Sequence, residues 1–302
     1  MAGHASGKLR WMMIYEIKNE FLTVKADTNG AILWSVKDRQ EREYIWQGDP
    51  KYWDEHGANL FPYIGRIWEG SYTYRGQIYH MDIHGFAKDT EFKLKKNSST
   101  ELSFVMEDSE VTLAQYPFHF SMEVKYQLDG KKLYVEYKVE NKDKKTMYFG
   151  AGGHPGINLP MEMGLSFEDY ELEFSSSCEP ERILFSSQCF VEGKSAFVLE
   201  EGQKMSMRHA LFDEDAIVLE GTSGEVTLKS EKGERGVRIS YPDMPYIGFW
   251  HMPHTESPYI CIEPWSSLPS RQGIQEDLEK QENLISLQAG GIKVLSWTME
   301  IL

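Results

Sequence analysis

The chain has 302 residues, of which 41% are hydrophobic and 26% charged, and its formal net charge is −15. A chain this acidic repels nucleic-acid backbones and anionic membrane surfaces, so we expect neither as a partner and favour a neutral small molecule. No run of 18 apolar residues occurs, which argues against a membrane-spanning helix.

The first residues of the chain have no regular pattern. Met1 to Trp11 lack the hydrophobic core of a secretion signal, and alternating sequence begins near Met13. We therefore expect residues 1–12 to be a leader or a disordered segment. No linker rich in Pro, Gly or Ser divides the rest of the chain, so residues 13–302 are predicted to form one domain.

The middle of the chain carries the strongest β pattern. Between Phe120 and Leu128 every second residue is apolar, and the same alternation resumes from Leu133 to Val139. The intervening Asp129-Gly130 is a strong hairpin signal. Two consecutive strands, each with one polar face, predict an antiparallel ribbon that packs on a core.

Similar strand patterns recur toward the C-terminus. They cover Tyr170–Phe174, Glu225–Lys229, Gly236–Tyr241, Tyr246–Trp250, Tyr259–Glu263 and Leu295–Ile301. Only Pro50–Glu55 and Gln275–Gln281 resemble short helices. Many strands at short spacing predict an all-β fold, a large antiparallel β-sandwich.

The cysteines do not have the spacing of a disulfide framework or a zinc site. Cys178, Cys189 and Cys261 are odd in number and follow neither disulfide nor zinc-ligand spacing. We expect three buried free thiols in a reducing compartment, which makes the cytoplasm the default location.

Two histidines and one glutamate are the candidates for chemistry. His84 and His154 each lie in a glycine-containing turn, and Glu263 follows an apolar strand. An imidazole and a partly desolvated carboxylate are suited to proton transfer at neutral pH. Each also has a structural interpretation: a histidine satisfied by backbone groups, or a glutamate paired with an arginine.

Two further residues are candidates for ligand binding. Arg66 follows an apolar segment through a glycine and could orient a ligand with its several donors, or belong to a buried ion pair. Trp250 offers a flat apolar surface to a sugar ring. The pairs Asp82/His84 and His251/His254 lack a third metal ligand nearby, and no nucleotide-binding motif occurs, so we predict no metal and no cofactor.

Together these segments resemble the aldose 1-epimerase (galactose mutarotase) family, closest to its shorter LacX-type branch. The resemblance spans nearly the whole chain and rests on Asn19–Val24, Asn59–Arg66, His84–Asp89, Gly153–Asn158 and Cys261–Trp265. It implies the β-supersandwich fold of that family and interconversion of the α and β anomers of a free aldohexose.

The resemblance also implies roles for individual residues. Glu263 corresponds to the general base at the anomeric hydroxyl and His154 to the acid at the ring oxygen. Arg66 and His84 correspond to sugar-binding residues. The family's sugar-binding aspartate matches Asp215, with Asp213 as the alternative. We also hypothesise that the Glu263 carboxylate raises the pKa of His154.

Three alternatives remain open from the sequence. A hexose 6-phosphate substrate would require extra cations, for which Arg42 and Arg75 are candidates. A non-catalytic sugar-binding protein would keep the aromatic residues and Arg66 without needing the acid–base pair. Glycoside hydrolysis normally uses two carboxylates, and only one is well placed here. The sequence does not choose between a monomer and a homodimer.

Overall fold

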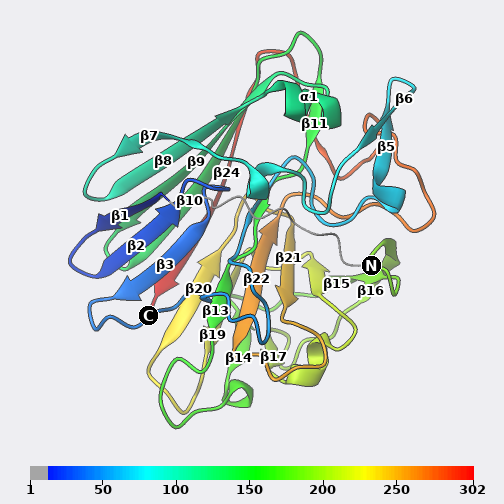
Figure 1. Cartoon of the computed structure of the whole chain (residues 1–302). Coiled ribbons are helices and arrows are strands. Elements are labelled where there is room, and N and C mark those ends of the chain that lie inside the picture. The colour runs from blue at the N-terminus through cyan, green and yellow to red at the C-terminus, as the bar shows by residue number, and fades with distance from the viewer. Residues whose placement is uncertain (1–12) are drawn as a thin grey trace.

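The computed structural model describes residues 13–302, so the predicted leader, residues 1–12, lies outside the described residues. Strands dominate these residues, and the pairings between them are antiparallel in the two large sheets (Figure 1). The prediction of an all-β, antiparallel β-sandwich is confirmed. None of the helices within residues 13–302 has the length and apolar character needed to cross a bilayer.

The larger sheet has nine strands and contains the predicted hairpin. Its order across the sheet is β17 (Lys204–Ser206), β14 (Glu171–Phe174), β19 (Glu225–Lys229), β20 (Gly236–Ser240), β24 (Ile292–Ile301), β10 (Lys132–Asn141), β9 (Phe120–Asp129), β8 (Glu101–Glu107) and β7 (Lys93–Asn97). The C-terminal strand β24 therefore lies at the centre and joins the two halves of the sheet.

The second sheet has eight strands and carries the residues of chemical interest. Its order is β16 (Val191–Ala196), β15 (Glu181–Phe185), β18 (Ile217–Glu220), β21 (Tyr246–Trp250), β22 (Tyr259–Trp265), β12 (Gly152–Gly153) and β4 (Asn59–Leu60), and β13 (Gly156–Asn158) also pairs with β22. All seven residues of β22 are buried.

Smaller elements complete the described chain. They are the sheet β1 (Ile14–Lys18), β2 (Leu22–Asp27) and β3 (Leu33–Asp38), the pairs β5 (Ser71–Tyr74) with β6 (Gln77–His80) and β11 (Met147–Phe149) with β23 (Ile285–Leu287), the helix α1 (Glu110–Gln115), and the 3-10 turns η1 (Trp68–Gly70), η2 (Ala87–Asp89), η3 (Phe167–Asp169) and η4 (His209–Phe212). Figure 1 shows β1–β3 beside the part of the large sheet that holds β7–β10.

The alternating residues of the strands form the core. On β9 the apolar positions are buried and the polar positions between them are half-buried or exposed, as a period of two requires. One continuous cluster joins buried side chains of both large sheets, among them Val124, Tyr137 and Trp297 from the first and Ile260 and Ile262 from the second. The apolar faces of the two sheets therefore enclose a shared core.

The helices expected from the sequence were wrong in two places. Residues 50–55 and 275–281 form turns, with one isolated bridge at Asp277, and contain no helix. The α-helix lies instead at α1, where the side chain of Ser109 accepts the backbone N–H of Thr112 and Thr112 caps Ser109 in return. The predicted burial of the thiols is confirmed for Cys261, whereas Cys178 and Cys189 are only half-buried.

Candidate active site

The pairing of β22 with two short strands brings Glu263 and His154 together. Gly152 of β12 lies opposite Trp265, and Gly156 of β13 lies opposite Cys261. The same antiparallel register places the turn residue His154 opposite Glu263. Two residues more than 100 positions apart therefore face each other because both are fixed to one buried strand.

The His154 turn is held by close backbone packing. The backbone N–H of His154 donates to the Ala58 carbonyl at 3.0 Å. A Cβ on the neighbouring Gly57 would lie 2.2 Å from the His154 carbonyl oxygen, so only glycine fits there. The turn is consequently a fixed part of the sheet surface.

Burial sets the protonation of the pair. His154 Nε2 lies 3.2 Å from Glu263 Oε2, and the Glu263 side chain is 2% exposed. Burial, followed by the negative charge of Asp215, raises the pKa of Glu263 well above its ordinary value. Burial lowers the pKa of His154 to about 4, which contradicts the hypothesis that Glu263 raises it. For His154, loss of hydration outweighs the charge of Asp215, which acts in the raising direction. Burial therefore favours the neutral form of each residue, a carboxylic acid for Glu263 and an imidazole for His154.

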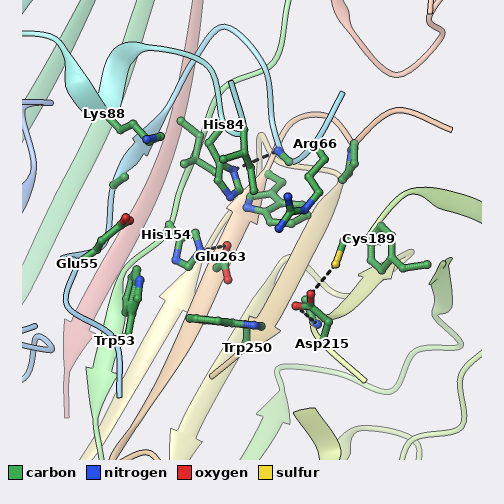
Figure 2. A pocket seen from close by; sticks show the side chains of 18 of the residues that line it. Trp53, Glu55, Arg66, His84, Lys88, His154, Cys189, Asp215, Trp250 and Glu263 are labelled. Carbon is green, nitrogen blue, oxygen red and sulfur yellow. Dashed lines mark hydrogen bonds and ion pairs between the residues drawn. The ribbon is translucent and has the colours of Figure 1, made fainter. Parts of the chain in front are cut away.

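His84 is a neutral donor at the same pocket. Its Nδ1 accepts the backbone N–H of Gly65 at 3.1 Å, so the ring proton resides on Nε2 (Figure 2). Burial lowers the pKa of His84 well below its ordinary value, and the neighbouring His154, Lys88 and Arg66 add to this. The following Gly85 serves the scaffold and not a ligand, because a Cβ there would lie 2.3 Å from the Phe61 carbonyl oxygen.

Arg66 lines the same pocket and forms no ion pair with a carboxylate of residues 13–302. Its backbone is fixed, since the Arg66 carbonyl accepts the N–H of Ser270 at 3.0 Å. The predicted alternative of a buried ion pair is therefore wrong. The guanidinium donors remain available for a ligand.

The structure separates the two candidate aspartates. Asp215 lines the pocket with Arg66 and His154, and its Oδ1 accepts the N–H of Ala216 at 2.8 Å. Asp213 points to a different partner: its Oδ1 accepts the backbone N–H of His254 at 3.0 Å and lies 3.3 Å from His254 Nδ1. Of the two, Asp215 is the one that can reach a ligand beside the pair.

Aromatic rings form one wall. Trp250 at the end of β21 meets Trp53 edge to face at a centroid separation of 5.5 Å, and both rings lie within 5.8 Å of the His154 ring. The sequence did not single out Trp53, because its segment, residues 50–55, resembles a helix. Its place is fixed by Trp46 Nε1, which donates to the Trp53 carbonyl at 2.9 Å.

Together these groups enclose a cavity of about 430 Å³ (Figure 2). It is also lined by Glu55, Lys88 and Cys189, to which the sequence had assigned no role in a site. The suggested phosphate-binding cations lie elsewhere: Arg42 donates to the Met161 carbonyl, and Arg75 faces Glu279 at 3.9 Å. The pocket combines apolar walls with a few convergent polar groups, an arrangement typical of a small-molecule site.

One group in residues 13–302 has the composition of a metal site. The ligand atoms of His154, Cys261 and Glu263 lie within 4.8 Å of one another. Two of the three are the candidates for proton transfer, so a cation held there would occupy the atoms that such transfer needs. The two histidines of the other pair considered have different partners. His251 Nε2 is hydrogen-bonded to His209 Nδ1 at 3.1 Å, and the backbone N–H of His254 donates to Asp213.

Comparisons with known proteins found a matching family model and similar curated relatives. A family model described as aldose 1-epimerase matches residues 13–284. The plasmid and chromosomal LacX proteins of Lactococcus lactis subsp. lactis are each 35% identical over 266 residues, covering 85% of this chain and 88% of the relative.

Two solved structures are similar over nearly the full length. One is a galactose mutarotase related enzyme from Lactobacillus acidophilus, 32% identical with a TM-score of 0.91, covering 96% of this chain and 97% of that one. The other is a galactose mutarotase-like protein from Lactobacillus casei, 29% identical with a TM-score of 0.90, covering 96% of this chain and all of that one.

Proposed function

The chain belongs to the aldose 1-epimerase family, and on that premise we propose that it interconverts the α and β anomers of a free aldohexose by acid–base catalysis. The observation that carries this proposal is the contact of His154 Nε2 with Glu263 Oε2 at 3.2 Å in a cavity of about 430 Å³. A base and an acid beside one sugar ring suffice for the reaction.

Ring opening begins from the ion-pair form of the two residues. The Glu263 carboxylate takes the proton of the C1 hydroxyl while the His154 imidazolium gives a proton to the ring oxygen, and the C1–O5 bond breaks. The products are an open-chain aldehyde, a protonated Glu263 and a neutral His154. Rotation about C1–C2 and the reverse transfers close the ring as the other anomer.

The buried pair supports this scheme because a single proton is shared between the Glu263 carboxyl group and Nε2 of His154. The resting form, with Glu263 protonated and His154 neutral, has the protonation of the ring-opened intermediate. The reactive form differs from it only by movement of that proton toward Nε2. Each well-placed proton-transfer group contributes on the order of 100- to 10,000-fold to the rate.

The other groups support binding of the sugar. Arg66 and the Nε2–H of His84 can donate to sugar oxygens, while the carboxylate of Asp215 can accept from hydroxyls. Trp250 and Trp53 offer apolar faces to the C–H surfaces of the ring.

Polarimetry tests the proposal. Freshly dissolved α-glucose and α-galactose should reach equilibrium rotation faster with the protein, and Glu263→Gln should slow this at least 100-fold without unfolding the protein. Glu220→Gln on strand β18 of the same sheet is the matched control and should retain the parental rate. A Glu263→Gln variant within a few fold of the parent would remove the base from the scheme. Sugar binding without any rate enhancement by the parent would instead favour a binding protein.

A further inference from the structure

The wall of the pocket opposite Trp53 and Glu55 contains a free thiol that the proposed mechanism does not use. Cys189 Sγ donates to Asp215 Oδ2 at a separation of 2.6 Å (Figure 2). We propose that Cys189 is a positioning residue, whose thiol fixes the Asp215 carboxylate in the orientation that binds the sugar. This role rests on the proposed function and adds one residue to its binding site.

A short hairpin loop delivers this thiol to the pocket. Cys189 lies between β15 and β16, where the backbone N–H of Ser186 donates to the Phe190 carbonyl at 2.9 Å. The N–H of Cys189 donates back to the Ser186 carbonyl, also at 2.9 Å. The Phe190 ring packs against Trp68 with a centroid separation of 4.9 Å, which anchors the loop.

The backbone at this contact is unusual on both sides. Cys189 has φ of +65° and Asp215 has φ of +77°, both in the left-handed region that favours glycine. Aspartate tolerates this region better than most residues, but cysteine has no such advantage. A residue kept at an unfavourable φ is a pointer to a role for its side chain. Glycine would adopt this backbone conformation without strain, so what cysteine adds at position 189 is its thiol.

The contact completes the positioning of the carboxylate. The N–H of Ala216 holds Oδ1 at 2.8 Å and the thiol holds Oδ2, so both oxygens are fixed from the protein side. Each carboxylate oxygen still has a lone pair for a sugar hydroxyl. A neutral donor orients the charge without neutralising it, which a lysine at the same place would do.

The state of the thiol agrees with a donor and not with a nucleophile. Burial, then the hydrogen bond and charge of Asp215, raise the pKa of Cys189 to about 11, and the nearby Arg66 only partly opposes this. The thiol therefore keeps its proton at neutral pH. Cys189 is also a neighbour of both charged residues that are expected to bind the sugar, Arg66 and Asp215.

Kinetics of Cys189 variants test the role. Cys189→Ala and Cys189→Gly should raise KM roughly tenfold, the usual effect of losing a hydrogen bond to a charged group, with kcat within about threefold of the parent. Cys189→Ser keeps a donor and should restore KM to within about twofold. Cys189→Gly should unfold at the same temperature as the parent or higher, because it relieves the backbone. Cys178→Ala, at a half-buried thiol outside the pocket, is the control.

Parental KM in the alanine and glycine variants would overturn the inference. So would a serine variant as impaired as the alanine variant, because the effect would then be one of packing.

A second measurement does not depend on turnover. The rate of alkylation of Cys189 by iodoacetamide at pH 8.5, followed by peptide mass spectrometry, should rise roughly tenfold in Asp215→Asn, because the carboxylate no longer holds the thiol proton. An unchanged rate would show that the two side chains do not interact and would overturn the inference. A parent protein inactive on every free sugar would end the proposed function, and this measurement would still decide the pairing of Cys189 with Asp215.

Discussion

Replacing Glu263 by glutamine should make the protein more stable at alkaline pH, in addition to slowing the proposed reaction. Glu263 is 1% exposed, and its pKa in the folded protein is raised well above its ordinary value. The folded protein therefore keeps a proton that the unfolded chain loses above about pH 4.5. A group of this kind contributes stability below its unfolded pKa, and that stability is lost as the pH rises toward the folded pKa.

The size of the effect is set by one proton. A single group changes the free energy of unfolding by at most about 1.4 kcal/mol per pH unit, hence up to about 2.7 kcal/mol between pH 6.5 and 8.5. His154 acts in the opposite direction and in another window. Its folded pKa is about 4, so its contribution is complete above its unfolded pKa of about 6.5 and is lost only as the pH falls toward 4. The parent and the variant share His154, so the pH dependence of the difference between their stabilities reports Glu263.

The assay is urea unfolding of the parent and of Glu263→Gln, followed by tryptophan fluorescence at pH 6.5, 7.5 and 8.5. The stability of the variant relative to the parent should grow with pH. The control is Glu220→Gln, whose carboxylate is 30% exposed and pairs with Lys194, and its difference from the parent should stay constant. If the Glu263→Gln difference were also constant, Glu263 would already be ionised in the folded protein and the argument from burial would be refuted.

Three further predictions concern the remaining groups. His154→Asn should lower kcat at least 100-fold with sugar binding retained; a polarimetric rate near the parent's would assign the acid elsewhere. Arg66→Ala should raise KM roughly tenfold to 100-fold with a smaller change in kcat, measured by initial rates, and unchanged KM would make Arg66 structural. In calorimetry, Asp215→Asn should weaken sugar binding about tenfold, whereas Asp213→Asn should leave the affinity unaltered. A loss of affinity in Asp213→Asn alone would make Asp213 the binding residue.

Much of the fold could be predicted because its strands alternate in sequence. The residues from Phe120 to Val139 carry the pattern of two strands that each have one apolar and one polar face, and their hairpin lies beside the central strand β24 of the larger sheet. The helix expected at residues 50–55 failed for a reason that lies outside the segment. The Trp53 carbonyl accepts the N–H of the Trp46 ring, a contact that no local pattern reveals.

The placement of His154 beside Glu263 was predictable for a reason that does not apply to the rest of the pocket. His154 and Glu263 each lie in a distinctive motif, and the register of β22 brings those motifs together. Cys189 and Trp53 lie in loops without such a motif, and they enter the pocket through tertiary packing. The direction of the His154 pKa shift also required the structure, because only the structure shows that burial of the imidazole outweighs the opposing charge of Asp215.

The enclosure that disfavours each separate charge is compatible with the proposed reaction because the pair never has to carry net charge. Before ring opening it is an imidazolium beside a carboxylate, and afterwards it is an imidazole beside a carboxylic acid. Both forms are neutral overall, and the sugar is neutral in its cyclic and open forms.

In a site of low dielectric constant, two opposite charges 3.2 Å apart attract strongly, which offsets part of the cost of forming them. A lone carboxylate at the place of Glu263 would bear the full cost of desolvation. Burial therefore favours this reaction only while both partners are present, so removal of either should affect the protonation of the other.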